Sequence, residues 1–436
     1  MATVAWVGNG QNIAQQVTLT VTAVANGGTL TATINGKNVT YTCTASDTTT
    51  TAATAWAALL NARTAPPEFQ QITWSASTTV ITGVSDVAGL PFYSTGTGTG
   101  GLSKSQAGGA SVTLAQTVAN SSQNDVGNAA NWSRLGIAAL PTTGDDVVVA
   151  NTSVSMLYNL TALNGVTMNS WTRYQSFTGT IGLPENNPLG YVEFRPTYLQ
   201  LASSVNQSIA AFQLLLGAGT TGNGPTRERY DMQSYRTNLV VLASGSAADQ
   251  YAIRFLGSHG QNTVTLVGTS VGICMLPTEA AAGTATISQA TVDGGGTLDM
   301  GTGCAFSGTA GGGTITITGG SSTMFNTPSA IVAKNDATVT LAAVNGTYSS
   351  ITATNSCSLT ILAAMTISVI TLAKGCTLDA SNSLGAVTIT TSTLDGDTCQ
   401  VNDPNNVITW TNATTVLAQV TDGPFIFTGS RTVRII

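Results

Sequence analysis

Three segments near the C-terminus share one pattern: Ile331-Val-Ala-Lys-Asn-Asp-Ala-Thr-Val-Thr-Leu341, Ile351-Thr-Ala-Thr-Asn-Ser-Cys-Ser-Leu-Thr-Ile361 and Ile370-Thr-Leu-Ala-Lys-Gly-Cys-Thr-Leu-Asp-Ala380. Their first residues are 20 and then 19 positions apart. A repeat of this length is typical of one coil of a β-solenoid. One short alternating strand cannot bury its apolar face alone, whereas stacked coils bury it in a continuous core. The repeat therefore predicts a parallel β-helix, with right-handed winding because crossover connections are almost always right-handed.

Two columns of equivalent residues follow from this alignment. The hydroxyl column is expected to contain Thr297, Thr314, Thr338, Ser358, Thr377 and Thr398. Cys357 and Cys376 occupy the same repeat position, which predicts stacked, buried thiols, with a disulfide between coils as the alternative. The six cysteines and the single His259 form no CxxC pair or Cys/His cluster, so we expect no zinc site, no thiol-redox motif and no cofactor.

The composition narrows the class of protein. Only 8% of the 436 residues are charged, against about 25% in an average soluble domain. Polar but uncharged surfaces suit stacked coils, because like charges on neighbouring coils would lie only about 4.8 Å apart. The net charge of −6 and the absence of a basic cluster argue against nucleic-acid binding. The longest nearly apolar run, residues 361–373, is too short to span a bilayer, and the N-terminus shows no secretory signal.

Residues 1–118 are predicted to form a separate α+β domain. Alternating runs flank Asn35-Gly36, the strongest short hairpin signal, and place Ala32 opposite Val39. A helix over residues 48–63, with Asp47 as N-cap, carries apolar side chains at helical spacing and would cover the hairpin. Further strands are expected at residues 72–77, 79–84, near 91–95 and at 111–118, with a loop at 96–109.

The remaining chain is divided into three parts. Residues 119–160 are predicted to form a Trp-bearing connector and the first coil. Residues 161–400 are predicted to form the β-helix, which has an irregular, loop-rich part near 170–235. Residues 401–436 are predicted to form C-terminal strands that cap the β-helix. The polar stretch 217–236 is predicted to be a loop that projects from a coil or packs on another subunit. The whole chain is thus expected to be mainly β: a right-handed parallel β-helix preceded by a small α+β domain.

Two stretches resemble known phage proteins. The order of a hairpin, Asp47-Thr-Thr-Thr-Thr-Ala-Ala-Thr-Ala-Trp-Ala-Ala-Leu-Leu-Asn-Ala62, Pro67-Glu-Phe69, Ile72-Thr-Trp-Ser-Ala76 and Ala88-Gly-Leu-Pro-Phe92 resembles a module of phage and prophage virion proteins. Asn124-Asp-Val-Gly-Asn-Ala-Ala-Asn-Trp-Ser133, Leu140-Pro-Thr-Thr-Gly-Asp-Asp-Val-Val-Val149 and Ser153-Val-Ser-Met-Leu-Tyr158 are similar to the opening that precedes β-helices in bacterial surface proteins and phage structural proteins. In this opening Trp132 is expected to plug the first coil, and Gly144, Asp145 and Asp146 to turn the chain into its first strand.

The resemblance implies a non-enzymatic virion structural protein. It would be a homotrimer on the virion surface that decorates the capsid or forms a head or tail fibre. Its partners would be further copies of itself, the major capsid protein or another virion protein, with a host-surface glycan as a further candidate, and neither nucleic acid nor membrane. The alternatives are a tailspike-like protein that binds or degrades polysaccharide, and a bacterial surface adhesin.

Candidate contact residues lie in the irregular coils. Tyr174, Phe177, Tyr191 and Tyr198 are interpreted as exposed aromatic side chains that stack on sugars or anchor either a neighbouring subunit or the N-terminal domain. Glu193 with Arg195, Arg227 and Arg229 is expected to form salt bridges between subunits, with substrate binding as the alternative. Glycoside hydrolysis would need two of the carboxylates Glu185, Glu193 and Asp231 about 5 to 9.5 Å apart. The spacing predicts no such pair, and we expect no catalytic residue and no metal ligand.

Overall fold

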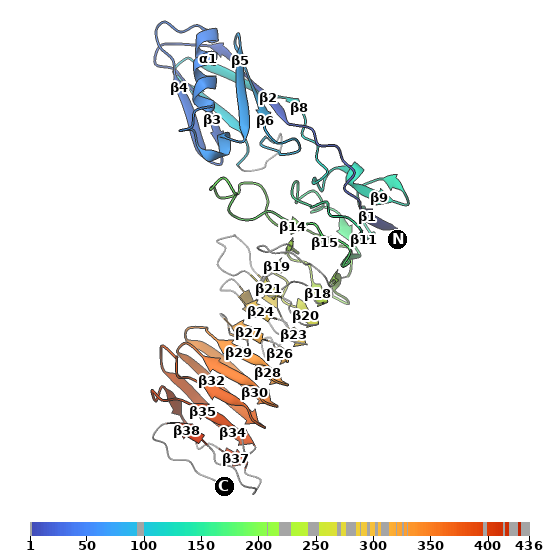
Figure 1. The fold of residues 1–436 in the computed structure, drawn as a ribbon, viewed down its shortest axis with the longest axis vertical. Helices are drawn as coiled ribbons and strands as arrows, with labels where there is room; N and C mark the ends of the chain where they lie inside the picture. Colours follow the sequence, from blue (N-terminus) through green and yellow to red (C-terminus); the bar gives the residue numbers. More distant parts are fainter. Residues whose placement is uncertain are drawn as a thin grey trace.

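The computed structural model shows a small N-terminal domain at one end of an elongated β-solenoid (Figure 1). It describes residues 2–93, 100–206, 208–217, 228–242, 253–267, 272–275, 285–287, 289–293, 297–300, 304–306, 314–319, 321–324, 327–328, 330–395, 399–412, 415–417 and 426–428. Within these ranges, no helix is both long enough and apolar enough to cross a membrane.

Two long sheets run the length of the solenoid, and their strands pair in parallel except at the N-terminal end. In spatial order the first contains β10 (Ile137–Ala138), β9 (Trp132–Arg134), β1 (Thr3–Trp6), β11 (Asp146–Val149), β13 (Ser170–Arg173), β16 (Phe212–Leu216), β18 (Thr237–Leu242), β20 (Thr263–Val267), β23 (Gln289–Asp293), β26 (Thr314–Thr318), β28 (Ala330–Lys334), β30 (Gly346–Thr354), β32 (Met365–Ala373), β34 (Val387–Asp395) and β36 (Ile408–Trp410), with β37 (Thr415–Leu417) also on β34.

The second sheet contains β14 (Leu199–Gln200), β17 (Glu228–Asp231), β19 (Ile253–Leu256), β21 (Gly272–Met275), β24 (Thr297–Met300), β27 (Ser321–Met324), β29 (Thr338–Leu341), β31 (Ser358–Ile361), β33 (Thr377–Asp379), β35 (Gln400–Asn402) and β38 (Ile426–Thr428). Two short parallel pairs, β12 (Thr167–Met168) with β15 (Ala202–Ser203) and β22 (Ala285–Ile287) with β25 (Cys304–Phe306), complete the coils.

The repeat register confirms the predicted parallel solenoid. Ile331, Ile351 and Ile370 are direct partners in successive strands, and all three side chains are buried. Leu359 stands opposite Leu378 in the other sheet and is equally buried. Equivalent apolar residues therefore stack from coil to coil in one core, as the repeat requires. The right-handed winding stays a prediction.

The predicted hydroxyl column is wrong at two positions: Thr314 lies in the other sheet, and Gln400 takes the place next to Thr377 that was expected for Thr398. Thr314 lies in the first sheet, where it pairs with Gln289 and Ala330. In the second sheet, the column contains Thr297, Ser321, Thr338, Ser358, Thr377 and Gln400. Thr398 lies outside the described residues. Strands of both sheets alternate with the same period of two, so spacing alone does not tell to which sheet a threonine belongs.

The N-terminal end of the solenoid is built from segments far apart in sequence. β1 pairs in parallel with β11 and antiparallel with β9, and its Val4 and Trp6 are buried in the solenoid core. Trp6, Trp132, Trp171 and Tyr230 form a chain of edge-to-face ring contacts, with centroids 5.0, 6.3 and 6.3 Å apart. The first strand thus belongs to the solenoid, although the prediction placed it in the N-terminal domain.

The N-terminal domain has its own hydrophobic core. Its elements are β2 (Gln16–Ala23), β3 (Thr29–Ile34), β4 (Lys37–Thr42), α1 (Thr49–Leu60), the 3-10 turn η1 (Pro67–Phe69), β5 (Ile72–Ser77), β6 (Val80–Ser85), β7 (Ser103–Ala107) and β8 (Ser111–Val118), in two sheets ordered β5-β6-β2-β8 and β4-β3-β7. The predicted hairpin register is confirmed, with Ala32 opposite Val39. A second 3-10 turn, η2 (Ala129–Asn131), lies in the connector.

Four local predictions about this domain are wrong. Residues 91–93, the described part of the strand expected near 91–95, form no strand, because the amides of Phe92 and Tyr93 bind the Gln15 side chain instead of a neighbouring strand. The N-cap of α1 is Thr48, whose hydroxyl accepts a hydrogen bond from the Thr51 amide, while Asp47 supports the cap through the Thr51 hydroxyl. The helix ends at Leu60, because Asn61 caps it and binds the backbone of Trp74. The predicted loop at 96–109 contains the strand β7. This strand has no apolar alternation, but its backbone hydrogen bonds to β3 hold it at the edge of the sheet.

The described part of the stretch 217–236 is more regular than predicted. Residues 228–231 form β17 in the second sheet, and Glu228, Arg229 and Tyr230 are buried there. A projecting loop is therefore wrong for residues 228–231, because buried polar partners, described below, allow charged residues to occupy a core strand. Residues 218–227 lie outside the described residues. The described part of residues 401–436 contains β36, β37 and β38, and a capping role for the rest stays a prediction.

Candidate functional site

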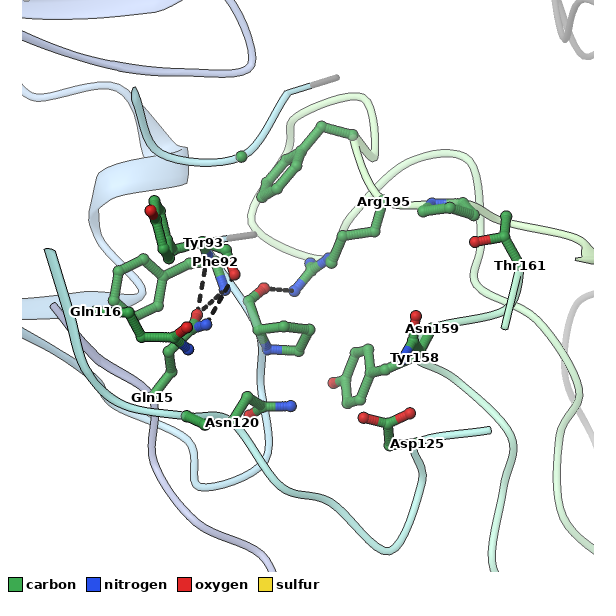
Figure 2. A pocket seen from close by; sticks show the side chains of 15 residues that line it. Gln15, Phe92, Tyr93, Gln116, Asn120, Asp125, Tyr158, Asn159, Thr161 and Arg195 are labelled. Atoms are coloured by element: carbon green, nitrogen blue, oxygen red, sulfur yellow. Dashed lines mark hydrogen bonds between the residues drawn. The ribbon is translucent and has the colours of Figure 1, made fainter. Parts of the chain in front are cut away.

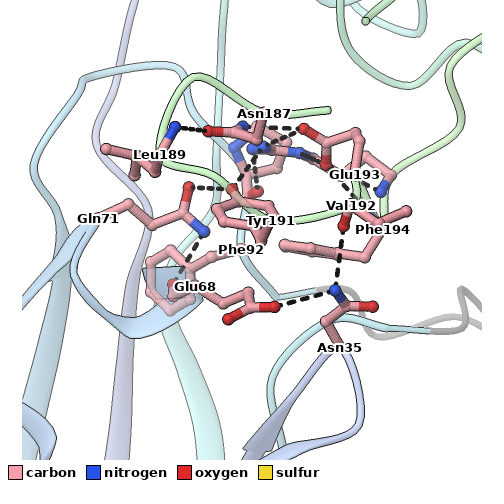
Figure 3. Close-up of polar contacts among 12 residues, drawn as sticks. Asn35, Glu68, Gln71, Phe92, Asn187, Leu189, Tyr191, Val192, Glu193 and Phe194 are labelled. Carbon is pink, nitrogen blue, oxygen red and sulfur yellow. Dashed lines mark hydrogen bonds and ion pairs between the residues drawn. The ribbon is translucent and has the colours of Figure 1, made fainter. Parts of the chain in front are cut away.

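A loop of the solenoid at residues 184–196 fastens the N-terminal domain to the rod (Figure 3). The loop folds back on itself through a bridge between Asn186 and Val192. At its tip the Tyr191 hydroxyl donates to Gln71 Oε1 over 3.1 Å, and the Val192 carbonyl accepts from Asn35 Nδ2 over 3.0 Å. Gln71 and Asn35 both belong to the N-terminal domain. This loop is therefore called the docking loop.

A buried ion pair holds the docking loop in shape. Arg195 Nε and Nη2 donate to the two carboxylate oxygens of Glu193 over 2.7 and 2.8 Å, and Arg195 Nη1 donates to the Pro91 carbonyl over 3.3 Å. Burial alone would raise the pKa of Glu193, but the hydrogen bonds and the charge of Arg195 outweigh it and lower that pKa. The same pairing raises the pKa of Arg195 against the opposing effect of burial. Both groups are therefore charged and mutually neutralised.

A pocket of about 390 Å³ lies between the N-terminal domain and the first coils (Figure 2). Its walls include Tyr93 and Gln116 from the N-terminal domain and Tyr158, Phe194 and Arg195 from the solenoid. The guanidinium carbon of Arg195 lies 5.7 Å from the centre of the Tyr158 ring and 5.0 Å from that of Phe194. Aromatic faces and a neutralised charge thus surround the space.

Several polar groups of the pocket come from the connector. Figure 2 shows Asn120, Asp125 and Tyr158 together, with Arg195 above them. Asp125 accepts a hydrogen bond from the Gly127 amide over 2.7 Å, and burial raises the pKa of its carboxyl group. Asn120 Oδ1 is buried and has no hydrogen-bond partner in the described part of the chain. An acceptor of this kind stabilises the fold only when a donor reaches it.

A second buried ion pair, which the sequence analysis missed, lies inside the solenoid. Arg173 Nη2 is 2.6 Å from Glu228 Oε1, and both side chains are fully buried. Glu228 Oε2 accepts from the Tyr230 hydroxyl over 2.8 Å, and Arg173 Nη1 donates to the Gly217 carbonyl over 2.5 Å. Burial, together with the charge of Glu228, raises the pKa of Tyr230 well above its ordinary value. In the sequence, Arg173 lies two positions after Trp171 and therefore on the same face of the strand, which was the available sign that its side chain is buried.

The predicted contact residues have different surroundings. Only Tyr174 is exposed, at 51%, while Phe177, Tyr191 and Tyr198 are buried, so their interpretation as exposed aromatic residues is wrong. Tyr191 instead anchors the N-terminal domain, one of the roles considered for it. The ion pair of Glu193 forms with Arg195 in the same chain rather than between subunits. Arg229 is buried in β17, and Arg227 lies outside the described residues.

The connector residues have structural surroundings. Trp132 is fully buried between Trp6 and Trp171. Gly144 has a φ of +85°, which favours glycine, and Asp145 binds the amide and hydroxyl of Thr142 and the guanidinium of Arg134. Asp146 accepts a hydrogen bond from the Ser170 hydroxyl in the next coil. These contacts stabilise the turn into β11 and the first coil.

The cysteines form a longer column than predicted. Cys357 and Cys376 are buried free thiols on neighbouring coils, and each donates to a backbone carbonyl three residues before it. Cys399, also buried, continues the column because the Gln400 amide binds the Cys376 carbonyl. Within the described ranges, no group of three or more potential metal ligands is present.

No family model, no curated protein and no solved structure matched the chain when it was compared with them. The geometry of the molecule itself therefore carries the functional argument.

Proposed function

We propose that the protein is a non-enzymatic phage virion structural protein, a trimer on the particle surface that decorates the capsid or forms a head or tail fibre. The observation that supports this proposal best is that the docking loop holds the N-terminal domain against the solenoid. Its contacts to Gln71 and Asn35 fix a compact domain at one end of a stacked β-rod. A rod with a firmly attached terminal domain suits a part that spans a distance on a particle. The phage-like segments at 47–92 and 124–158 support the same assignment.

The polar groups of the rod also favour a structural role. Glu193 has both carboxylate oxygens bound by Arg195. Asp231 accepts hydrogen bonds from Gln200 and from the Gln233 amide, and burial raises its pKa. Two of the three carboxylates considered for glycoside hydrolysis thus have structural partners. A general acid or base must instead be able to reach the substrate.

Particles produced from a strain that carries the gene provide the test. Antibodies raised against the chain should label intact particles in immunogold electron microscopy, on the head for a decoration protein or on the tail for a fibre. Particles that lack the chain in both labelling and mass spectrometry, although infected cells express it, would refute the proposal. Sedimentation velocity at micromolar concentration should give the mass of a trimer, and a monomer would remove that part of the proposal.

A polysaccharide-binding protein is the second candidate, because the pocket in Figure 2 combines aromatic and polar walls. Degradation would release new reducing ends from capsule or lipopolysaccharide of the host. Their appearance with the wild-type chain, and their absence with a Glu185→Gln and Asp231→Asn double variant, would favour the enzymatic form of this alternative.

A further inference from the structure

The pocket between the N-terminal domain and the solenoid has the size of a small-ligand site. Ligand pockets in proteins usually measure about 300 to 1,000 Å³, and this one has a volume of about 390 Å³. It lies where two separately packed cores meet, a common location for binding sites. The space is therefore suited to a ligand of one or two small rings.

Its walls are held in place by contacts that do not involve a ligand. Gln15 accepts hydrogen bonds from the amides of Phe92 and Tyr93 and donates to the Tyr93 carbonyl, over 2.7 to 2.8 Å. On the other side, the ion pair with Glu193 fixes Arg195 against the Tyr158 ring. Walls fixed in advance lower the entropic cost of binding.

The charges of the pocket argue against an ionic ligand. Arg195 is already neutralised by Glu193, so it offers little attraction to a phosphate or carboxylate. The carboxyl group of Asp125 would repel an anion whenever it is ionised. A cation would be attracted to Asp125 but would gain nothing from the neutralised Arg195, and the loss of its hydration on entering the pocket would oppose binding. A neutral ligand avoids both penalties.

The other polar groups that line the pocket favour a ligand rich in hydroxyl groups. The side chains of Asn120 and Asp125 line the space, and a purely apolar ligand would offer them no hydrogen-bond partner there. The Tyr158 ring can pack against the apolar face of a sugar ring, while hydroxyl groups can donate to Asp125 and accept from the Asn120 amide nitrogen. We propose that this pocket binds a neutral sugar residue, which gives the rod a carbohydrate-recognition site at its domain junction. This inference does not depend on the structural role, and it rests on the polysaccharide-binding alternative, to which it gives a ligand class and named contact residues.

Saturation-transfer NMR on the full chain tests this inference with free glucose, galactose, mannose, rhamnose, N-acetylglucosamine and the anionic N-acetylneuraminic acid as probes. At least one neutral sugar should receive saturation and give a dissociation constant of about 10 mM or better. Tyr158→Ala and Asn120→Ala should each weaken its binding at least fivefold. Tyr174→Ala, which removes an exposed aromatic side chain that does not line the pocket, should leave it unchanged.

Circular dichroism shows whether each variant keeps the wild-type fold. The conservative Tyr158→Phe, which retains the ring, should keep most of the affinity. The inference is overturned if no neutral sugar binds up to about 10 mM, if N-acetylneuraminic acid binds best, or if Tyr158→Ala or Asn120→Ala, shown to be folded, binds as the wild type does.

Discussion

The buried pair Arg173 and Glu228 allows a quantitative test of the solenoid core. Replacing Arg173 with Met removes the only cation paired with Glu228 among the described residues and leaves a carboxylate inside the rod. Breaking a fully buried ion pair in this way costs about 3 to 5 kcal/mol. We therefore expect Arg173→Met to lower the free energy of unfolding by about 3 to 5 kcal/mol at pH 7.

The assay is urea unfolding followed by tryptophan fluorescence, to which Trp171 contributes because its ring contacts Tyr230. With a urea m-value of about 3 kcal/mol/M, the midpoint should fall by about 1 to 1.5 M. The double variant Arg173→Met with Glu228→Gln removes both charges and should recover most of the stability.

Arg63→Met is the matched control, since Arg63 is exposed on the N-terminal domain and surface changes of this kind usually stay within about 0.5 kcal/mol. A loss below about 1 kcal/mol for Arg173→Met, or losses that simply add in the double variant, would refute the reasoning.

Three further predictions concern the docking loop, one glycine and the thiol column. Because the folded-state pKa of Glu193 is lowered, its stabilising effect is present above the unfolded pKa of about 4.3 and lost as the pH falls through the folded value. Hydrogen exchange, corrected for intrinsic rates, should therefore show the docking loop losing protection below about pH 4, and unchanged protection down to pH 3 would contradict this. Gly182→Ala should cost more than about 1 kcal/mol in urea unfolding, since φ is +94° and a Cβ would lie 2.5 Å from the Thr197 carbonyl oxygen. Gly165→Ala, with open space around it, should cost clearly less, and equal costs would count against the steric argument. Burial raises the pKa of the Cys357 thiol, so a thiol reagent should modify it only after unfolding, and rapid labelling of this residue in the folded protein, mapped by mass spectrometry, would show that the column is accessible.

The sequence predicted those parts of the fold that repeat or depend on neighbours in the chain. Ile331, Ile351 and Ile370 revealed the parallel stack because coils of nearly equal length place the same side chain at the same position. The Asn35-Gly36 turn fixed its hairpin register for a similarly local reason. Irregular coils carry no such signal, which is why β17 was taken for a loop.

The candidate site was also predicted only in part from the sequence. Tyr191, Glu193 and Arg195 were recognised as contact residues because aromatic and charged side chains are rare in this chain, but their partners were not predictable. Gln71 lies 120 positions from Tyr191, and Asn120 and Asp125 approach Arg195 only after the docking loop folds back. Contacts over such separations leave no periodic pattern in the sequence.

By itself, therefore, the sequence determined that the chain is a low-charge β-solenoid with a small domain before it, because stacking and alternation are local, repeated requirements. Tertiary structure alone decided that β1 starts the solenoid, that Arg173 meets Glu228 in its core, and that a pocket forms where the two cores join. Each of these depends on which distant segments share one space, and that is set by packing of the whole chain rather than by any stretch of it.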